Sequence, residues 1–542
     1  MVASKQELYV GAFPWLAPGD RCVATTSVEM CRGFITLPFS TSSVICDECK
    51  DPLPLVAQWT DTNRTTWAKY ELPRGETQIA RSRVYYSDPR VAGQASSEIP
   101  LCSGISRSKL DEDLEIEDEL SPQYEHFARL RDHIDNHTEF INDLYDQVKP
   151  NRYYWEGNHG GHAIRSVFRT SLRWLKSDDR DHARLALIVK LAREISRTLQ
   201  QVCEAPRVVL RRSREFQKIA KIQEIDPACL RWLARQPGRD VYERAGSRQQ
   251  LLGIVRKEDT DTLENRVVKD LLHRARVECA NYISIYRDYQ NQERVRLVQK
   301  FRRQIIHWEK TSEIAAAKRL TGPVQPNYVL LHENKYRKLW DAYQLLLSQQ
   351  KQKDDIWKWR DRTFSESCEV GLLSLLAKYT RRSTFCRSDI AIRMESLNGR
   401  YISAETEIGS GVVKDAHSNT ELTFVRGGIT ALKCQYIPVD LLSLAADFYI
   451  LNSGSTNNRV IPVWCLSEVE EKKLSDAIEI LEFKLSASRA RASTFPLILV
   501  FHNSQAERYF WGQRGLIASL EFPMPKSMRK LEAFIFSILG IA

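Results

Sequence analysis

Short apolar runs separated by turn-forming residues mark the first part of the chain. Residues 1–105 contain such runs, for example Gly33–Phe39 and Arg83–Tyr86, between clusters of Gly, Pro, Ser and Asp. Runs of this length and spacing are typical of β-strands joined by tight turns. The pattern therefore predicts a β-rich N-terminal domain over residues 1–105.

The spacing of apolar residues becomes helical over residues 123–360, after a linker at residues 106–122. Spacings of three and four place apolar side chains on one face of a helix. The clearest series is Leu185, Ile188, Val189, Leu191, Ile195 and Leu199. Residues 262–318 predict one long helix or two consecutive helices, ending before Gly322-Pro323. Residues 333–352 predict a partner helix, so we expect a long helical hairpin within this domain.

Both patterns occur in the last stretch, residues 361–542. The runs Val460–Trp464 and Pro496–Phe501 are apolar throughout, as expected for strands that are buried on both faces. A helical pattern over Ser467–Leu485 separates them. Alternation of this kind predicts an α/β domain with a mixed central sheet, and hence an α+β multidomain protein.

Charge is distributed unevenly along the 542 residues. The net charge is +10. Residues 207–303 hold 23 Lys and Arg against 13 Asp and Glu, a difference of +10, so this segment accounts for the whole excess. Residues 111–120, in contrast, hold seven acidic residues and no basic one. A basic middle segment favours a polyanionic partner, and a solvated charged helix face is the simpler alternative.

The cysteines and the hydropathy pattern bear on location and on metal binding. We find no apolar run of about 18 residues and no secretory signal, so we expect a cytoplasmic protein without a membrane partner. Twelve cysteines scattered through a long chain favour free thiols over a disulfide framework. Two pairs of cysteines could supply a tetrahedral zinc site, although the first pair is widely spaced. These four residues are Cys22, Cys31, Cys46 and Cys49.

The predicted helix over residues 262–318 begins with a polar motif, D-T-L-E-N-R-V-V-K at residues 261–269. Its first residues can cap a helix, and an acid in the first turn is favourable. The motif resembles the D-T-x-E-N-R-x-x-K signature of a bacterial domain family of unknown function that occurs in phage-defence islands. Leu230–Pro237 and Tyr336–Trp340 match further parts of the family pattern. The signature residues here are Asp261, Thr262, Glu264, Asn265 and Arg266.

The resemblance implies a PD-(D/E)xK nuclease core of the McrC-like type on the C-terminal side, and a partner AAA+ or other NTPase. Such a core holds Mg²⁺ between carboxylates on adjacent strands, with a lysine two residues after the second one. The family pattern D-A-K-Y falls on residues 433–436. These residues begin at the end of an expected strand, Ile429–Cys434, and continue just past it. That strand follows another expected strand, Glu421–Val425. Lys433 thus replaces the aspartate, and Gln435 replaces the lysine.

The remaining acids near this expected site are Glu421 on the first strand and Glu366 or Glu369 on the preceding helix. Because Mg²⁺ requires hard oxygen ligands, a lysine in place of the aspartate disfavours metal binding. We therefore interpret the core as a degenerate nuclease without a cofactor. An active Mg²⁺-dependent DNA endonuclease is one alternative, and a protein-binding scaffold that docks through residues 111–120 is another. The acids open to the endonuclease are Glu366, Glu369, Glu405, Glu407 and Glu421.

The basic middle segment completes the hypothesis. We expect it to bind the phosphate backbone of DNA without base specificity, so that salt weakens binding. The residues assigned to this contact are Arg287, Arg294, Arg296, Lys300, Arg302 and Arg303. The sequence thus predicts a non-catalytic, DNA-associated subunit of a bacterial defence or restriction-like complex.

Overall fold

The computed structural model of the chain divides into two compact units, residues 181–350 and a unit built from residues 1–180 and 351–542. The described residues are 9–11, 13–17, 33–38, 44–47, 52–60, 64–72, 81–87, 94–100, 129–135, 138–142, 186–379, 384–388, 390–391, 403–404, 410–414, 421–432, 434–453, 459–467, 469, 471–501, 508–520 and 528–539. No helix within these ranges is long and apolar enough to cross a membrane.

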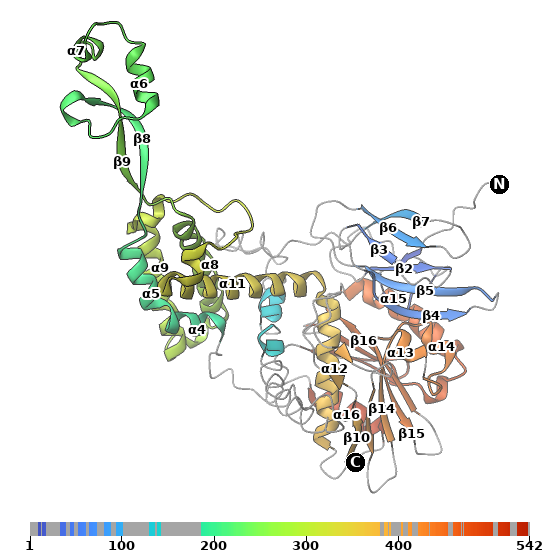
Figure 1. Ribbon diagram of the computed structural model, residues 1–542. Helices are drawn as coiled ribbons and strands as arrows, with labels where there is room; N and C mark the ends of the chain where they lie inside the picture. The colour runs from blue at the N-terminus through green and yellow to red at the C-terminus, as the bar shows by residue number, and fades with distance from the viewer. Residues whose placement is uncertain are drawn as a thin grey trace, which may run out of the picture. The chain divides into compact units, whose positions relative to one another are not determined.

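The N-terminal region is β-rich, as its short apolar runs predict (Figure 1, blue). One sheet has the order β1 (Tyr9–Gly11), β2 (Gly33–Leu37), β5 (Thr66–Leu72) and β4 (Leu55–Thr60). A second sheet has the order β3 (Val44–Cys46), β6 (Arg81–Ser87) and β7 (Gln94–Pro100). Ile35, Tyr70 and Val84 are among the buried residues that join the two sheets in one apolar cluster.

The C-terminal region is built on an eight-stranded mixed sheet. The strands follow the order β10 (Thr384–Ser388), β13 (Ser410–Lys414), β14 (Glu421–Arg426), β15 (Phe448–Ser453), β16 (Arg459–Leu466), β17 (Leu497–Phe501), β19 (Gly515–Leu520) and β18 (Arg508–Phe510). The sheet is antiparallel from β10 to β16, and β16, β17 and β19 are parallel. β16 and β17 are buried along nearly their whole length, and this burial explains why their sequences are continuous apolar runs.

Helices complete the C-terminal region, and a separate pair of short strands lies between β10 and β13 in the sequence. The helices are α12 (Arg360–Tyr379), α13 (Ile429–Leu432), α14 (Val439–Leu442), α15 (Glu471–Ala487) and α16 (Met528–Leu539). The pair consists of β11 (Ile390–Ala391) and β12 (Ser403–Ala404). The connection from β16 to its parallel neighbour β17 runs through α15, which confirms the helix expected between these two apolar strands.

One of the strand predictions for this region is wrong. The residues expected to form a strand from Ile429 to Cys434 begin instead with the single helical turn α13. Gly428 adopts a φ of +71°, and a Cβ on Gly427 would lie 2.1 Å from the carbonyl oxygen of Ala446. The chain therefore turns sharply after β14, where glycine is required. β14 pairs with β13 on one side and on the other with β15, which comes some twenty residues later in the chain.

A segment near the N-terminus packs into the core of the C-terminal sheet region. Phe13, Trp15 and Leu16 are buried there, and the indole Nε1 of Trp15 donates to the carbonyl oxygen of Ala477 at 2.8 Å. The Nζ of Lys69, on β5, donates to the carbonyl oxygens of Pro14 and Leu16 at 2.5 Å each. The N-terminal strands and the C-terminal sheet are therefore parts of one unit, although they lie far apart in sequence.

The second unit contains the expected helical core. Its helices include α4 (Leu187–Glu194), α5 (Ser196–Glu204), α8 (Leu263–Ile285), α9 (Glu293–Thr311), α10 (Tyr328–His332) and the first part of α11 (Asn334–Lys358). The stretch 262–318 thus forms two main helices, followed by the 3-10 helix η5 (Glu313–Ala316). Apolar side chains from α4, α5, α8, α9 and α11 share one buried cluster.

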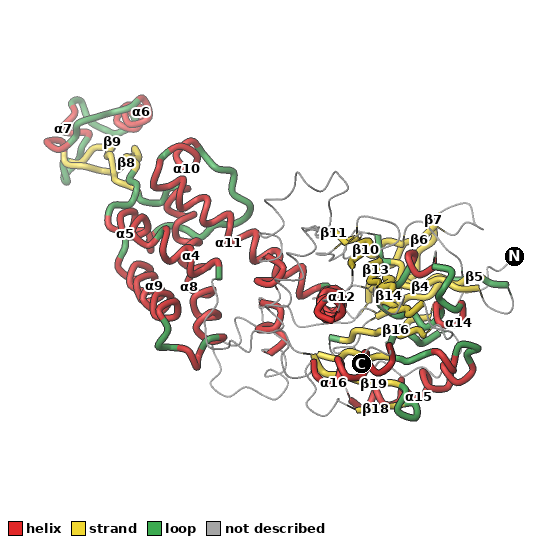
Figure 2. The backbone as a smooth tube through the Cα atoms, turned by 90° about the horizontal axis from the view of Figure 1, so that it is seen from below, coloured by secondary structure: helices red, strands yellow, loops and turns green. Residues whose placement is uncertain are grey.

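A β-ribbon interrupts this helical unit, where the sequence pattern predicted helices only. Strands β8 (Val209–Lys218) and β9 (Gln250–Asp259) pair antiparallel over ten residues each. Between them lie the 3-10 helix η3 (Ile219–Lys221) and helices α6 (Pro227–Ala234) and α7 (Val241–Arg244). Figures 1 and 2 both show the ribbon leaving the helices, with α6 and α7 at its far end. We call residues 209–259 the arm.

Candidate functional site

The carboxylate expected on the helix before the nuclease strands is paired with an arginine. Glu369 lies on α12, and its carboxylate accepts hydrogen bonds from Arg426 of β14 through Nε at 2.7 Å and 2.8 Å. The Nη2 atom of the same guanidinium lies 2.7 Å from Oε2 of Glu369. The two side chains are 4% and 14% exposed, so this is a buried, two-pronged ion pair.

Glu366, one helical turn earlier on α12, adds a second buried carboxylate to this cluster. Burial opposes the charged form of Arg426, but the negative charges of Glu369 and Glu366 outweigh it and raise the pKa of the guanidinium. Arg426 is thus a permanent cation beside the helix acids. Both oxygens of Glu369 are already engaged by Arg426, so this carboxylate is neutralised by a protein cation.

The structure does not place the other expected nuclease residues beside the Glu369–Arg426 pair on a second strand. Glu421 is the first residue of β14, opposite Lys414 and Ser453. Gln435 is exposed in the turn after α13, while Lys433, Glu405 and Glu407 lie outside the described residues. β15 lies beside β14 in the sheet and β16 lies beside β15, and their sequences are FYILNS and RVIPVWCL. Neither contains an acid or a lysine, so no D/E-x-K motif occurs on them.

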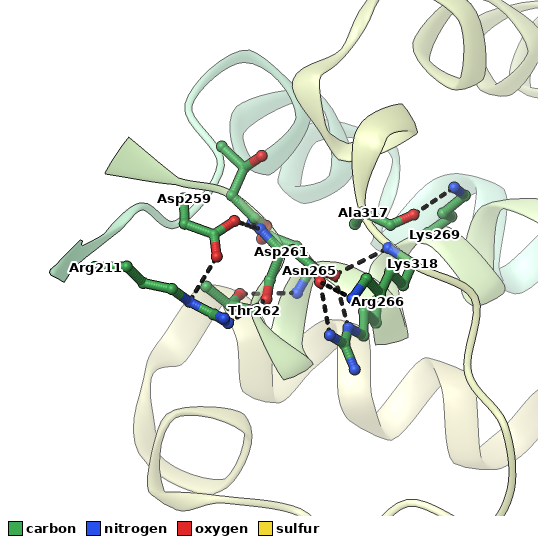
Figure 3. Close-up of polar contacts among 10 residues, drawn as sticks. Arg211, Asp259, Asp261, Thr262, Asn265, Arg266, Lys269, Ala317 and Lys318 are labelled. Carbon is green, nitrogen blue, oxygen red and sulfur yellow. Dashed lines mark hydrogen bonds and ion pairs between the residues drawn. The ribbon is translucent and has the colours of Figure 1, made fainter. Parts of the chain in front are cut away.

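Asp261, the first signature residue, holds the root of the arm to the helical core (Figure 3). Its Oδ1 and Oδ2 each accept a hydrogen bond from Arg266, from Nε and Nη2, at 2.7 Å. The backbone N–H of Lys318 donates to Oδ1 at 2.9 Å. Hydrogen bonds from Arg266 and Lys318 together lower the pKa of Asp261. Asp261 therefore ties the start of α8 to the segment that follows η5.

Thr262 and Lys269 extend the same joint along α8. Thr262 is the N-cap of α8, and its hydroxyl accepts from the backbone N–H of Asn265 at 3.3 Å. Two turns along the helix, the Nζ of Lys269 donates to the carbonyl oxygen of Ala315 at 2.7 Å. It also donates to the carbonyl oxygen of Ala317 at 2.5 Å (Figure 3). Both side chains satisfy backbone groups of the fold, as buried or half-buried polar groups require.

Glu264 and Asn265 form the buried part of the signature. Glu264 accepts from Arg207 at 2.7 Å and from the side chain of Asn327 at 2.8 Å. The amide of Asn265 donates to the carbonyl oxygens of Arg207 and Thr260 at 2.8 Å and 2.7 Å. These contacts hold the chain entering β8 and the chain leaving β9 at the first turn of α8.

Tyr336 of α11 closes this network. Its hydroxyl donates to Oδ1 of Asn265 at 3.0 Å and accepts from the backbone N–H of Arg207 at 2.9 Å. Burial raises the pKa of Tyr336 to about 12, so the phenol keeps its proton. The signature groups described above all have partners inside the fold. Their arrangement accounts for a structural joint at the base of the arm and leaves no catalytic group exposed there.

Exposed cations lie along one face of α9. Val295, Val298, Phe301, Ile305 and Trp308 are buried, and the exposed positions on the opposite face recur at intervals of three and four. These exposed positions include Glu293 in the first turn, followed by Arg296, Lys300, Arg303, His307 and Lys310. We call the last five the α9 basic face, in which Arg296, Lys300, Arg303 and Lys310 are the cations. Of the side chains on it, Arg296 has a hydrogen bond from Nη2 to Asn291 at 3.3 Å.

Not all of the basic residues predicted to bind nucleic acid belong to this face. Arg287 is exposed in the 3-10 helix η4 (Arg287–Tyr289) that precedes α9. Arg294 and Arg302 are only half-exposed. The Nε of Arg302 is buried without a hydrogen-bond partner among the described residues, and its charge acts on Cys279 of α8. Arg302 is therefore directed partly into the helical core.

The expected zinc cysteines lie mostly outside the described residues. This applies to Cys22, Cys31 and Cys49. Cys46 is buried at the end of β3, and its Sγ lies 3.8 Å from Oδ1 of Asp47. Within the ranges that are described, no group of three or more His, Cys, Asp or Glu side chains is arranged to hold a metal ion.

Comparison with known protein families gives one match. Residues 159–343 match the model of a domain of unknown function, DUF2357. The matched range contains the arm, its signature joint and the α9 basic face, and it stops before α12 and the mixed sheet. A search of curated proteins finds no match to the chain.

Proposed function

We propose that this protein binds nucleic acid through the backbone phosphates without cutting it. The observation that carries the proposal is the α9 basic face, where Arg296, Lys300 and Arg303 are exposed on successive turns of one helix. Cations spaced along one side of a helix can neutralise consecutive phosphates, and this gives binding that depends on salt rather than on base sequence.

The lack of catalysis in this proposal is supported by the pairing of Glu369 with Arg426. A PD-(D/E)xK centre uses acids from neighbouring elements to hold Mg²⁺. Here the helix acid is neutralised by a guanidinium that the fold itself supplies. β15 and β16, which follow β14 in the sheet, carry neither an acid nor a lysine. We therefore treat the mixed sheet as a degenerate nuclease core.

The wider setting belongs to the same proposal and rests on the signature at residues 261–269. Its resemblance to a defence-associated family supports a role in a cytoplasmic bacterial defence or restriction-like complex. The same resemblance supports a partner NTPase, which would supply the energy-dependent step that a non-catalytic subunit lacks.

Removing charge from the α9 basic face tests the binding proposal. The variant carries Arg296→Gln, Lys300→Gln and Arg303→Gln. A matched control carries Lys335→Gln, Arg337→Gln and Lys338→Gln, which removes three exposed cations from α11. Fluorescence anisotropy with labelled 30-bp DNA is measured between 50 and 200 mM salt.

The α9 variant is expected to bind on the order of 10- to 100-fold more weakly, with a salt slope lower by about 2.7, because each lost phosphate contact removes roughly 0.9. The α11 control should keep the wild-type slope. Equal losses in the two variants would show that net charge alone drives binding, and the α9 basic face would then have no special role.

A further inference from the structure

The arm carries cations on adjacent rungs of its ribbon. Arg211 lies directly opposite Lys257, and Arg212 lies directly opposite Arg256. Like charges at directly opposed positions destabilise a β-ladder. Acids offset part of this repulsion: Asp259 pairs with Arg211, Glu215 with Lys257, and Glu224 with both Arg212 and Arg256. Four cations therefore share three acids, which leaves these two rungs with one positive charge in excess.

At the far end of the arm, the acids are engaged in holding the fold. Asp226 caps α6 and pairs with Arg214, with pKa lowered by the hydrogen bond from Arg214. Asp240 caps α7, and Glu243 accepts from the backbone N–H of Arg239 at 2.7 Å. Asp226 is therefore matched by Arg214, whereas Asp240 and Glu243 accept backbone hydrogen bonds and form no ion pair with an arginine of the arm.

The arginines at this end have exposed side chains. Arg235, Arg239 and Arg248 are all exposed, and none of the three forms an ion pair within the arm, all of which the structure describes. Arg235 follows Arg231 by one turn of α6, and Leu230 beside them is 54% exposed. On α7, Tyr242 is 64% exposed and Val241 is 45% exposed. We call Arg235, Arg239, Arg248 and Tyr242 the arm tip.

Exposed arginines beside an exposed aromatic ring form a surface that suits a polyanion with apolar parts. Arginines supply contacts to phosphate, and a tyrosine ring can stack on or wedge against bases. An acidic protein surface would satisfy the charge but would not require the cations to continue along both rungs of the ribbon. A duplex, which carries phosphates at regular intervals along its length, matches charge at the tip and along the ribbon together.

We infer that the arm tip is a second contact for double-stranded DNA, separate from the α9 basic face. The inference rests on the proposed function, because it adds a second site to a protein that binds nucleic acid. Ten-residue strands at about 3.3 Å per residue make the ribbon roughly 33 Å long. This length corresponds to about ten base pairs at 3.4 Å each. The arm therefore extends the length of duplex that the protein can hold by about one helical turn.

Binding as a function of DNA length tests this inference. Dissociation constants are measured for duplexes of 12, 18, 24, 30 and 36 bp with the full chain. The tip variant carries Arg235→Gln, Arg239→Gln and Arg248→Gln, and Tyr242→Ala is measured separately. None of these side chains has a hydrogen bond or ion pair in the described arm, so the substitutions should leave the fold intact, as circular dichroism will check. The α9 variant and the α11 control are measured in parallel.

Wild-type protein and the α11 control should gain on the order of tenfold or more in affinity once the duplex is long enough to reach both sites. The tip variant should bind short duplexes like the wild type and lose this gain, and Tyr242→Ala should lose part of it. The α9 variant should lose affinity for short duplexes.

Each other outcome is decisive. If the tip variant matches the wild type at every length, the arm tip serves another class of partner, such as a protein, and the inference is overturned while the proposed function stands. If the tip variant loses affinity at every length and the α9 variant loses none, the arm is the primary site and the α9 assignment fails. If the wild-type protein binds no duplex, both the function and the inference are wrong.

Discussion

Replacement of Arg426 by methionine is the perturbation that most directly examines the buried pair on α12 and β14. Methionine keeps much of the volume of the arginine stem and removes its charge. Glu369, which is 4% exposed in its side chain, would then be left as a carboxylate without its cation. Loss of one partner from a buried ion pair typically costs about 3–5 kcal/mol of folding free energy.

The size of the effect can be bounded from the chemistry of the carboxyl group. Stranded in the core, Glu369 can take up a proton, because burial raises the pKa of an unpaired carboxyl. Protonating a glutamate of ordinary pKa near 4.3 at pH 7 costs about 3.7 kcal/mol, or roughly 1.36 kcal/mol for each pH unit. At pH 5 the same cost is only about 1 kcal/mol. We therefore expect Arg426→Met to lose about 3–4 kcal/mol at pH 7 and much less at pH 5.

The sign of this pH dependence follows from linkage. In the variant, a buried carboxyl without its cation favours the neutral form, so the folded state binds a proton more tightly than the unfolded chain does. Stability is then recovered as the pH falls and is lost as the pH rises toward the folded pKa. The double variant Arg426→Met/Glu369→Met, which removes both charges, should recover at least half of the loss at pH 7.

Urea unfolding at pH 7 and pH 5 measures these differences. Hydrogen exchange of the amides in β14 and β15 provides the readout, because these strands report on the mixed sheet rather than on the helical unit. If Arg426→Met lies within about 1 kcal/mol of wild type at pH 7, or if its deficit stays the same at pH 5, the pair does not neutralise a buried carboxylate.

Two further predictions concern the signature joint. Tyr336→Phe removes the hydroxyl that bridges Asn265 and the backbone N–H of Arg207, and leaving these buried groups unsatisfied should destabilise the helical unit by about 1–3 kcal/mol in urea unfolding. Equal stability of the Phe variant would mean that the hydroxyl does not hold the joint. Asp261→Asn should abolish a pH dependence in the stability of the same unit. Hydrogen bonds from Arg266 and Lys318 depress the pKa of Asp261 in the folded state. Its contribution to stability is therefore full above the unfolded pKa near 3.9 and is lost as acid protonates the carboxylate. Thermal unfolding between pH 6 and pH 2.5 compares the two proteins, and parallel curves would contradict this role.

Hydrophobic spacing was sufficient to predict most of the regular elements. The short runs before residue 105 became β-strands, and the apolar runs in β16 and β17 became buried parallel strands because their side chains are needed on both faces. The helical series from Leu185 to Leu199 was also correct in its buried face, since Ile188, Val189, Leu191 and Leu199 are all buried. Local periodicity reports on burial, and these elements are buried in a regular way.

The arm was missed for the same physical reason. Along β8, nearly every position is exposed or half-exposed, so no alternation of apolar and polar residues signals a strand. The charged residues of the arm indicated only that this part of the chain is basic, and we expected those basic residues to lie on helices. The pairing of Glu369 with Arg426 could not be predicted from the sequence either, because 57 residues separate the two and only the folded sheet brings them together. The strand predicted after Gly427-Gly428 failed because those glycines turn the chain away from β14.

The central claim, binding without cleavage, is tested most directly by one assay on the purified full chain. Supercoiled plasmid is incubated with the protein in Mg²⁺, in Mn²⁺ and in EDTA, and each sample is divided between a gel-shift lane and a deproteinised lane. The account predicts a retarded complex in all three conditions and plasmid that stays supercoiled after the protein is removed. Nicked or linear plasmid that appears with metal and disappears with EDTA would contradict the account and would identify the mixed sheet as an active nuclease.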